Sequence, residues 1–291
     1  MVLKSSSIII AILAVAMMSI VPVGIKLVEA NEIEIGVVRL LVASFGLYIF
    51  IRVKRRFLLN GKQWLALMVL GLTFAAHWYT YFHSIKLSTA SIGAIGVSTY
   101  GIHLIVLGRI FLKQPIHLLD ILAIFAALGG LFLVSPELSW QSSYFQGLLW
   151  SIVSGFLYAC LPILHQKSSN IATDIRAWGQ FSFALVPFLL FGINQSWDFP
   201  RTDWYWLVAL AVVSTLFAHS LWVKATTELP AVMSSIIYYL YVPAALLASF
   251  MIINEQITLN ILVGASIIIL ANVMTLLSRV KASRSTANKL D

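Results

Sequence analysis

Residues 77–114 read HWYTYFHSIKLSTASIGAIGVSTYGIHLIVLGRIFLKQ, and this stretch decides the fold. Two apolar segments meet in it at a short polar joint, residues 86–89 (KLST), and His, Trp and Tyr recur at helical spacing on both sides. A similar pattern of apolar segments with His, Trp and Tyr occurs 141 residues later, over residues 218–255. The pattern predicts a chain of two similar halves, with its working residues where the halves meet.

Composition indicates a chain that lies in a lipid bilayer. Of its 291 residues, 60% are hydrophobic and 10% are charged, and the mean hydropathy is +0.93. Soluble domains carry about 25% charged residues. Apolar runs of about 20 residues, long enough to cross a ~30 Å hydrocarbon core as helices, recur along nearly the whole sequence. The sequence therefore predicts an all-α integral membrane protein.

The net charge of +8 and the isoelectric point of 9.6 raise the alternative of nucleic-acid binding. The basic residues lie in short loops beside apolar spans, however, as membrane topology signals do. We therefore expect the lipid bilayer, and no nucleic acid, as a partner. Cys160 is the single cysteine, which excludes an internal disulfide and a cysteine metal cluster.

Ten transmembrane helices are expected. The first five cover residues 8–27, 35–53, 64–83, 90–111 and 118–134, and the second five cover residues 147–165, 176–193, 204–223, 231–253 and 259–277. The first span resembles a signal peptide, because Lys4 precedes it and residues 28–30 (VEA) resemble a cleavage site. Its apolar run exceeds the ~7–15 residues of a signal core, so we interpret it as a helix.

The basic residues also orient the chain. With the N-terminus inside, all but four of the 19 Lys and Arg residues fall on the inner side, the exceptions being Lys26, Arg39, Lys86 and Arg201. The positive-inside rule then predicts the orientation of the chain, and we expect a multi-pass protein of the cell's inner (cytoplasmic) membrane. Both termini would be cytoplasmic, with residues 279–291 as a cytoplasmic tail.

An internal repeat appears when 141 is added to each residue number. The matched pairs are Ala43 and Ala184, Tyr81 and Trp222, Ala90 and Ala231, Tyr100 and Tyr241, and Gln114 and Glu255. Each half holds an odd number of spans, so equivalent helices must cross the membrane in opposite directions. The sequence therefore predicts two inverted five-helix repeats, residues 8–134 and 147–278, an arrangement that places substrate near the midplane between the halves.

Three sequence features resemble the EamA family of the drug/metabolite transporter (DMT) superfamily. They are Arg39 with Ala43, residues 88–90 (STA), and Pro243 followed by residues 254–258 (NEQIT). The likeness covers both five-helix repeats. The first half departs from the family pattern, with Ile102 in place of a proline and Gln114 in place of a glutamate.

The resemblance implies a fold and a range of functions. Helices one to four and six to nine would surround a central cavity, and helices five and ten would pack at its side. Relatives of this kind export amino acids, other metabolites or drugs, and some move nucleotide sugars. The substrate class stays open.

Arg39 is the strongest candidate for a specific role, because a cation inside a transmembrane helix costs about 2.5–3.5 kcal/mol of free energy near the bilayer centre and less toward the interface. One interpretation makes it an anchor for a substrate carboxylate, which a guanidinium binds in a bidentate fork. The other makes it a structural clamp that reaches outward to Glu32 or Glu34. Its repeat partner is the uncharged Gln180.

Aromatic and histidine side chains supply the other candidates for a substrate cavity. Polar-tipped rings at the midplane are expected to face a cavity or a neighbouring helix rather than lipid. Interhelical hydrogen bonding and simple aromatic packing are the structural alternatives. The candidates are His77, Trp78, Tyr81, Tyr100, His103, Tyr158, His219, Trp222, Tyr238 and Tyr241.

The chemistry of the spans limits what such a cavity does. Its histidines could relay protons, although buried structural histidines are commoner, and no two of them sit at metal-binding spacing with carboxylate support. We expect no metal and no cofactor. Carboxylates are missing from the expected span interiors, which argues against proton exchange for cationic drugs and favours a neutral, zwitterionic or anionic substrate.

Taken together, these features predict a membrane transporter, and not an enzyme, that exports a small organic metabolite such as an amino acid by alternating access. The sequence has no nucleotide motif, so a gradient would drive it, by facilitated movement or by proton or substrate counter-exchange. A monomer or a homodimer is expected. Two alternatives are a non-transporting membrane scaffold or receptor subunit and an intramembrane enzyme that uses His77 or His219.

Overall fold

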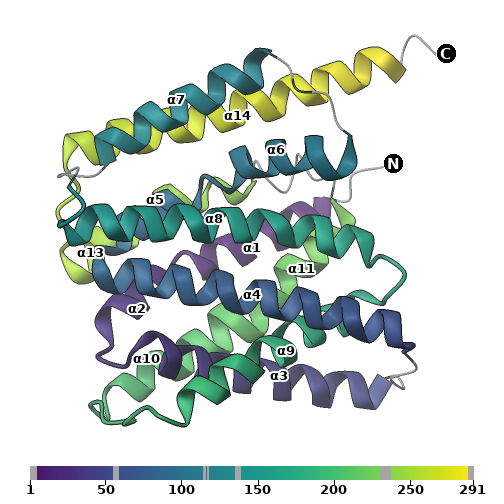
Figure 1. The fold of residues 1–291 in the computed structure, drawn as a ribbon, viewed down its shortest axis with the longest axis vertical. Helices are drawn as coiled ribbons and strands as arrows, with labels where there is room; N and C mark the ends of the chain where they lie inside the picture. Colours follow the sequence, from purple (N-terminus) through teal and green to yellow (C-terminus); the bar gives the residue numbers. More distant parts are fainter. Residues whose placement is uncertain are drawn as a thin grey trace.

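The computed structural model describes residues 5–54, 59–113, 116, 118–134, 139–229 and 237–287. Over these residues the regular secondary structure is helical (Figure 1). Among them, seven helical segments are long and apolar enough to cross a membrane, and three shorter apolar helices accompany them. The prediction of an all-α membrane protein is confirmed at this level.

The first half follows the expected spans closely. Its helices are α1 (Ser5–Met18), α2 (Val21–Leu27), α3 (Glu32–Lys54), α4 (Gly61–Leu87), α5 (Ala90–Val97), α6 (Tyr100–Leu112) and α7 (Leu118–Val134). The first span is divided between α1 and α2, with Pro22 in the first turn of α2. Proline is tolerated there because its missing N–H has no helical partner at that position.

The second half contains one irregular element. Its helices are α8 (Ser143–Lys167), α9 (Thr173–Gly192), α10 (Asp203–Ala209), the π-helix η1 (Leu210–Phe217), α11 (Ala218–Glu228), α13 (Tyr241–Ile253) and α14 (Leu259–Ala287). Helix α14 continues past the expected end at residue 277, so residues 279–287 of the expected tail are helical. Residues 231–236 of the expected ninth span lie outside the described residues.

Helix boundaries repeat in the same 141-residue register as the sequence. Helix α6 and helix α13 match at both ends, and α3 with α9 and α7 with α14 match at their first residues. Helices α6 and α13 also end alike, since Lys113 and Asn254 both adopt left-handed backbone conformations with φ of 54° and 52°. The halves thus share helix ends as well as residues. Two of the matched residues, Gln114 and Ala231, lie outside the described part.

The helices run roughly side by side, and α7 and α14 form a closely packed pair along one edge of the bundle (Figure 1). Helix α4 packs against α8 and α9, α3 packs against α9, and α1 packs against α11. Contacts between elements of the two halves therefore build the interior. The first residues of α1 and the last of α14 lie at the same end of the bundle (Figure 1).

Glycine lets α7 and α14 approach backbone to backbone. A Cβ atom at Gly130 would lie 2.8 Å from the carbonyl oxygen of Gly264, and one at Gly264 would lie 2.6 Å from the carbonyl oxygen of Gly130. Backbone atoms cannot yield as a side chain can. Gly129, the next residue on the same helix, is exposed, and a Cβ there would meet nothing within 4 Å.

We expect Gly130→Ala to lower the free energy of unfolding by about 1–3 kcal/mol, because the added methyl group forces the paired helices apart. Gly129→Ala, the matched control, should leave stability unchanged or raise it by roughly 0.5–1 kcal/mol, because alanine favours helix. Thermal unfolding of the two variants in detergent measures the difference. Equal melting temperatures would contradict the close contact.

Candidate functional site

A small internal cavity lies between elements of the two halves. Its volume is about 30 Å³, room for roughly one or two water molecules and about a tenth of an ordinary ligand pocket. Side chains therefore nearly fill the site in this structure. Its walls are Met18, Val21, Arg39, His77, Trp78, Tyr81, Phe82, Val97, Tyr158, His219, Tyr238 and Tyr241.

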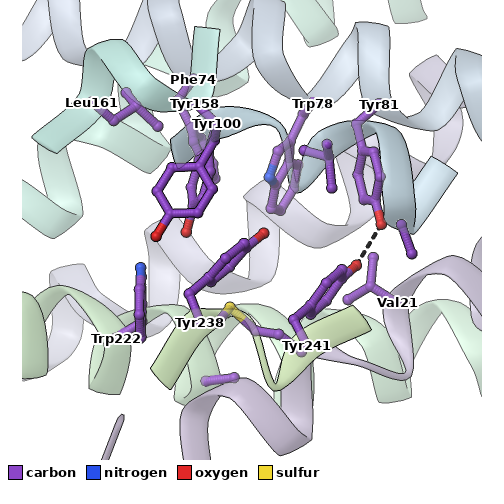
Figure 2. Close-up of a cluster of buried hydrophobic side chains, with 14 of the residues drawn as sticks. Val21, Phe74, Trp78, Tyr81, Tyr100, Tyr158, Leu161, Trp222, Tyr238 and Tyr241 are labelled. Carbon is purple, nitrogen blue, oxygen red and sulfur yellow. Dashed lines mark hydrogen bonds between the residues drawn. The ribbon is translucent and has the colours of Figure 1, made fainter. Parts of the chain in front are cut away.

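The structure brings most of the predicted site residues to this cavity. Arg39, His77, Trp78, Tyr81, Tyr158, His219, Tyr238 and Tyr241 form part of its wall. Tyr100 and Trp222 lie one layer behind, with their ring centroids 4.8 Å and 5.5 Å from that of Tyr238 (Figure 2).

His103, also predicted to line the cavity, lies apart from this wall. Its ring packs edge-on against Phe156 of α8 with the centroids 5.7 Å apart, and it is not among the described wall residues. Phe156 is 43% exposed, so this contact lies toward the bundle surface. A spacing of three residues leaves His103 rotated about 60° around α6 from Tyr100, enough to direct it to a different neighbour.

Tyrosine side chains join the two halves across the cavity. The hydroxyl groups of Tyr81 on α4 and Tyr241 on α13 are hydrogen-bonded to each other (Figure 2). Tyr238 stacks on Tyr241 with the ring centroids 5.4 Å apart and the planes 8° from parallel. Tyr100 and Tyr241, the matched pair of the repeat, are each 3% exposed and both contact Tyr238. Neither of them faces the lipid perimeter.

Arg39 is fully buried, seven residues after the start of α3 and so about 10 Å into the helix. Its Nε donates to Thr215 Oγ1 over 2.9 Å. Its Cζ lies 4.2 Å from the ring centroid of Trp78 and 5.2 Å from that of Phe82. The guanidinium is thus held by one hydrogen bond and two aromatic faces. Nη1 and Nη2 have no hydrogen-bond partner among the described residues.

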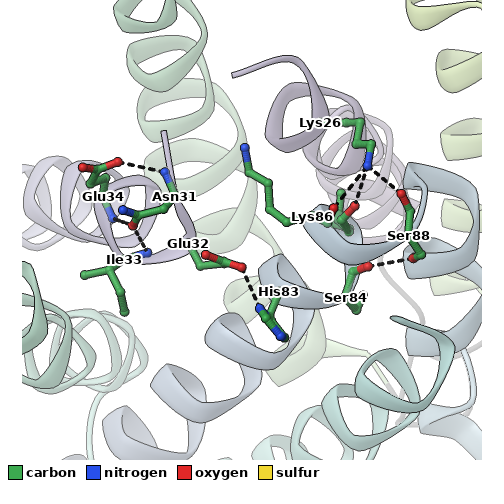
Figure 3. A network of polar contacts seen from close by, with 10 residues as sticks. Lys26, Asn31, Glu32, Ile33, Glu34, His83, Ser84, Lys86 and Ser88 are labelled. Carbon is green, nitrogen blue, oxygen red and sulfur yellow. Dashed lines mark hydrogen bonds and ion pairs between the residues drawn. The ribbon is translucent and has the colours of Figure 1, made fainter. Parts of the chain in front are cut away.

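The predicted clamp between Arg39 and Glu32 or Glu34 is corrected. The Glu32 carboxylate pairs with His83 Nδ1 over 2.7 Å (Figure 3). The Glu34 carboxylate accepts from the backbone N–H groups of Asn31 and Trp197 over 2.8 Å and 3.1 Å. Both acids lie in the first turn of α3, where the positive end of a helix favours carboxylates, and Arg39 lies a full turn or more further along.

The partner of Arg39 comes from the π-helix, a feature that the sequence did not reveal. Thr215 Oγ1 donates to the Leu210 carbonyl oxygen over 2.9 Å while it accepts from Arg39. Leu210 and Thr215 both lie in the π-helix η1, and π-helical turns occur often at functional sites. Thr215, His219 and Trp222 recur at helical spacing in the sequence, but no pattern shows that Arg39 is the partner of Thr215.

The two cavity histidines use one ring nitrogen for structure. His219 Nδ1 donates to the Ser214 carbonyl oxygen over 2.7 Å. His77 Nδ1 lies 3.1 Å from the Ser154 carbonyl oxygen and 2.8 Å from Ser154 Oγ. A nitrogen that faces a carbonyl must carry the proton, so in the neutral imidazoles Nε2 is the acceptor.

The pairing of His77 with Ser154 is not that of a base with a nucleophile. The Ser154 hydroxyl donates to the His77 backbone carbonyl oxygen over 3.1 Å. The imidazole therefore donates toward the serine instead of taking its proton, which is the reverse of an activated nucleophile. The contact holds α4 against α8.

A polar network lies at the end of the bundle where α2 ends and α3 begins (Figure 3). Lys26 Nζ donates to the carbonyl oxygens of Ile85, Lys86 and Ser88 over 3.2 Å, 3.3 Å and 2.5 Å. Lys86 Nζ donates to the Val28 carbonyl oxygen. Each lysine thus ties the end of one helix to the loop beside another.

Carboxylates of the second half extend this network to the first half. Asp203 accepts from the backbone N–H groups of Glu29 and Ala30 over 2.7 Å and 3.1 Å. Glu255 accepts from the Ser91 N–H over 3.2 Å at the start of α5. The role of Asp203 was missed, because its partners are backbone groups far away in the sequence.

Comparisons with known proteins agree with this architecture. The sequence profile described as "EamA-like transporter family" matches residues 5–135 and 145–277, nearly the whole chain. A protein of Archaeoglobus fulgidus described as "Uncharacterized transporter" is 24% identical over 247 residues, which cover 81% of this chain and 84% of that protein.

A crystal structure of another protein has a similar fold, with a TM-score of 0.69, 14% sequence identity, and coverage of 95% of this chain and 99% of that one. At that identity the likeness shows the fold alone. The family match spans both halves and confirms the resemblance seen in the sequence. The chain belongs to the EamA-like transporter family and is a multi-pass membrane transporter.

Proposed function

We propose that this protein exports a small organic metabolite, such as an amino acid or a similar amphipathic compound, by alternating access through the cavity around Arg39. The composition of the cavity wall supports this proposal. Hydrogen-bonding rings from both halves, Tyr81 and His77 on one side and Tyr241 and His219 on the other, meet there around a buried guanidinium. Such groups are expensive in a membrane interior and mark substrate pathways.

The repeat supplies a mechanism for movement. We propose ten transmembrane helices in two inverted five-helix halves, residues 8–134 and 147–278. Helix ends that recur at intervals of 141 residues support the repeat, and the common end shared by α1 and α14 accords with an even number of crossings. Rocking of such halves about a site at their seam exposes it alternately to the two sides of the membrane.

The polar network at one end is proposed to keep the outer gate closed. The positive-inside bias of the sequence puts this end outside, with cytoplasmic N- and C-termini in the cell membrane. Asp203 and Glu255 join elements of opposite halves there through backbone N–H groups. Such bonds can be exchanged for water when the halves separate.

The nearly filled cavity fits a carrier in an occluded conformation. A static scaffold would also be tightly packed, but family membership supports transport. An intramembrane enzyme would need an activated nucleophile, and the hydrogen-bond direction at His77 and Ser154 does not provide one. Transport in a gradient, with or without proton or substrate exchange, is the activity we propose. We expect a monomer or a homodimer without a cofactor.

Tyr100→Ala and Tyr241→Ala should each abolish substrate flux in proteoliposomes while the protein remains folded, because each removes a ring that shapes the cavity wall or its support. A ligand-stabilisation screen of purified protein against amino acids, nucleobases and quaternary amines supplies the substrate. Tyr205→Ala is the control, since this tyrosine on α10 is 80% exposed. Normal flux in both cavity variants would contradict the proposed site.

Asp203→Ala should speed hydrogen exchange at the amides of Glu29 and Ala30 by roughly 10-fold or more, since hydrogen bonds to a charged acceptor contribute about 1.5–3 kcal/mol. Hydrogen–deuterium exchange with mass spectrometry measures this. Asp198→Ala, which removes an exposed carboxylate of the same loop region, should leave those amides unchanged. Unaltered exchange in Asp203→Ala would rule out the proposed outer tie.

A further inference from the structure

We propose that this site selects a monocarboxylate with an apolar, preferably aromatic, body and no ammonium group, and that Arg39 binds the carboxylate. The inference rests on the proposed function, because it takes the cavity to be the substrate site. It narrows the proposed range of small amphipathic metabolites to those with a net negative charge, and so sets amino acids aside.

Arg39 has unused hydrogen-bonding capacity. Its Nε is satisfied by Thr215, whereas Nη1 and Nη2 are buried without a partner among the described residues. Buried polar groups are normally paired, and leaving a charged donor unpaired is costly. The two nitrogens present parallel N–H groups in a planar fork, which matches the two oxygens of a carboxylate.

The residues around Arg39 hold its guanidinium in place before a ligand arrives. Trp78 and Phe82 cover the guanidinium at 4.2 Å and 5.2 Å from their ring centroids, and Thr215 fixes its Nε edge. A guanidinium packed in this way cannot swing toward Glu32 or Glu34, which have their own partners. Nη1 and Nη2 are buried in this structure, so an incoming anion reaches them only when the surrounding side chains separate.

The charge of the described cavity wall favours a monoanion. Its residues include Arg39 and no carboxylate, and His77 and His219 each direct Nδ1 to a backbone carbonyl oxygen. A monoanion would bring the net charge of the occupied site to zero. A zwitterion would leave one positive charge uncompensated in a low-dielectric interior, which is unfavourable. A neutral imidazole can accept a hydrogen bond from an ammonium group without cancelling its charge.

The rest of the cavity wall is suited to an aromatic body. Tyr81, Tyr158 and Tyr238 present ring faces and hydroxyl groups to the same space (Figure 2). An aromatic body can pack among these rings once they separate. Their hydroxyl groups and the histidine Nε2 atoms can pair with a neutral hydroxyl or N–H group of the substrate. Aromatic hydroxy acids combine these features.

Phenyllactate and phenylalanine form a matched pair of probes, since they share a phenyl ring and a carboxylate and differ in a hydroxyl against an ammonium group. We expect phenyllactate to stabilise the purified wild-type protein at concentrations at least ~10-fold lower than phenylalanine. Its flux into proteoliposomes should be faster by a similar factor. This comparison requires no mutation.

Arg39→Gln should weaken phenyllactate binding by roughly 10- to 100-fold, the loss expected for hydrogen bonds to a charged group, and should remove the preference over phenylalanine. Arg39→Lys keeps the charge and loses the fork, so it should fall between the two. Arg176→Gln is the control. It removes another buried guanidinium, on α9, that donates to the His165 carbonyl oxygen away from the cavity, and it should keep the preference.

Equal or tighter binding of phenylalanine by the wild-type protein would overturn the charge selection while leaving the carrier proposal intact. An unchanged preference in folded Arg39→Gln would overturn the role of Arg39. If neither probe binds or moves, the aromatic monocarboxylate assignment fails. If the broader ligand screen is also silent, the proposed function fails with it.

Discussion

A buried arginine in a lipid bilayer is the constraint on which the interior of this protein depends. Its charge costs at least about 2.5–3.5 kcal/mol near the bilayer centre, and lipid offers no compensation. Three partners from two different parts of the chain enclose Arg39: the rings of Trp78 and Phe82 on α4 and the hydroxyl of Thr215 in η1. Cation–π contacts are worth about 0.5–2 kcal/mol each. Helices of both halves must therefore pack around this residue, and they do so without using all of its donors.

The sequence predicted the helices well, because lipid imposes long apolar runs and polar joints separate them. The joint at residues 86–89 falls at the end of α4, and the 141-residue register recurs in the ends of α6 and α13. Eight of the predicted site residues lie in the cavity wall, and helical spacing indicated which rings share a helix face. It could not fix the rotation of α6 about its own axis, which is why His103 contacts Phe156 instead of lining the cavity.

The contacts of the site were less accessible to sequence reasoning, since they join residues far apart in the chain. Arg39 and Thr215 are 176 positions apart, and Tyr81 and Tyr241 are 160 apart. The clamp expected with Glu32 or Glu34 failed because nearness in sequence was taken as nearness in space. These acids instead stabilise the start of α3 and the loops around it. No sequence pattern predicted the π-helix that positions Thr215.

We propose that the cavity enclosed by both halves is the substrate site and that Arg39 binds the carboxylate there. A cryo-electron microscopy or crystal structure of the protein with phenyllactate bound tests it most directly. We expect density for the carboxylate within hydrogen-bonding distance of Arg39 Nη1 and Nη2, with the phenyl ring among Tyr81, Tyr158 and Tyr238. Density for the ligand elsewhere, beside an empty cavity, would contradict it.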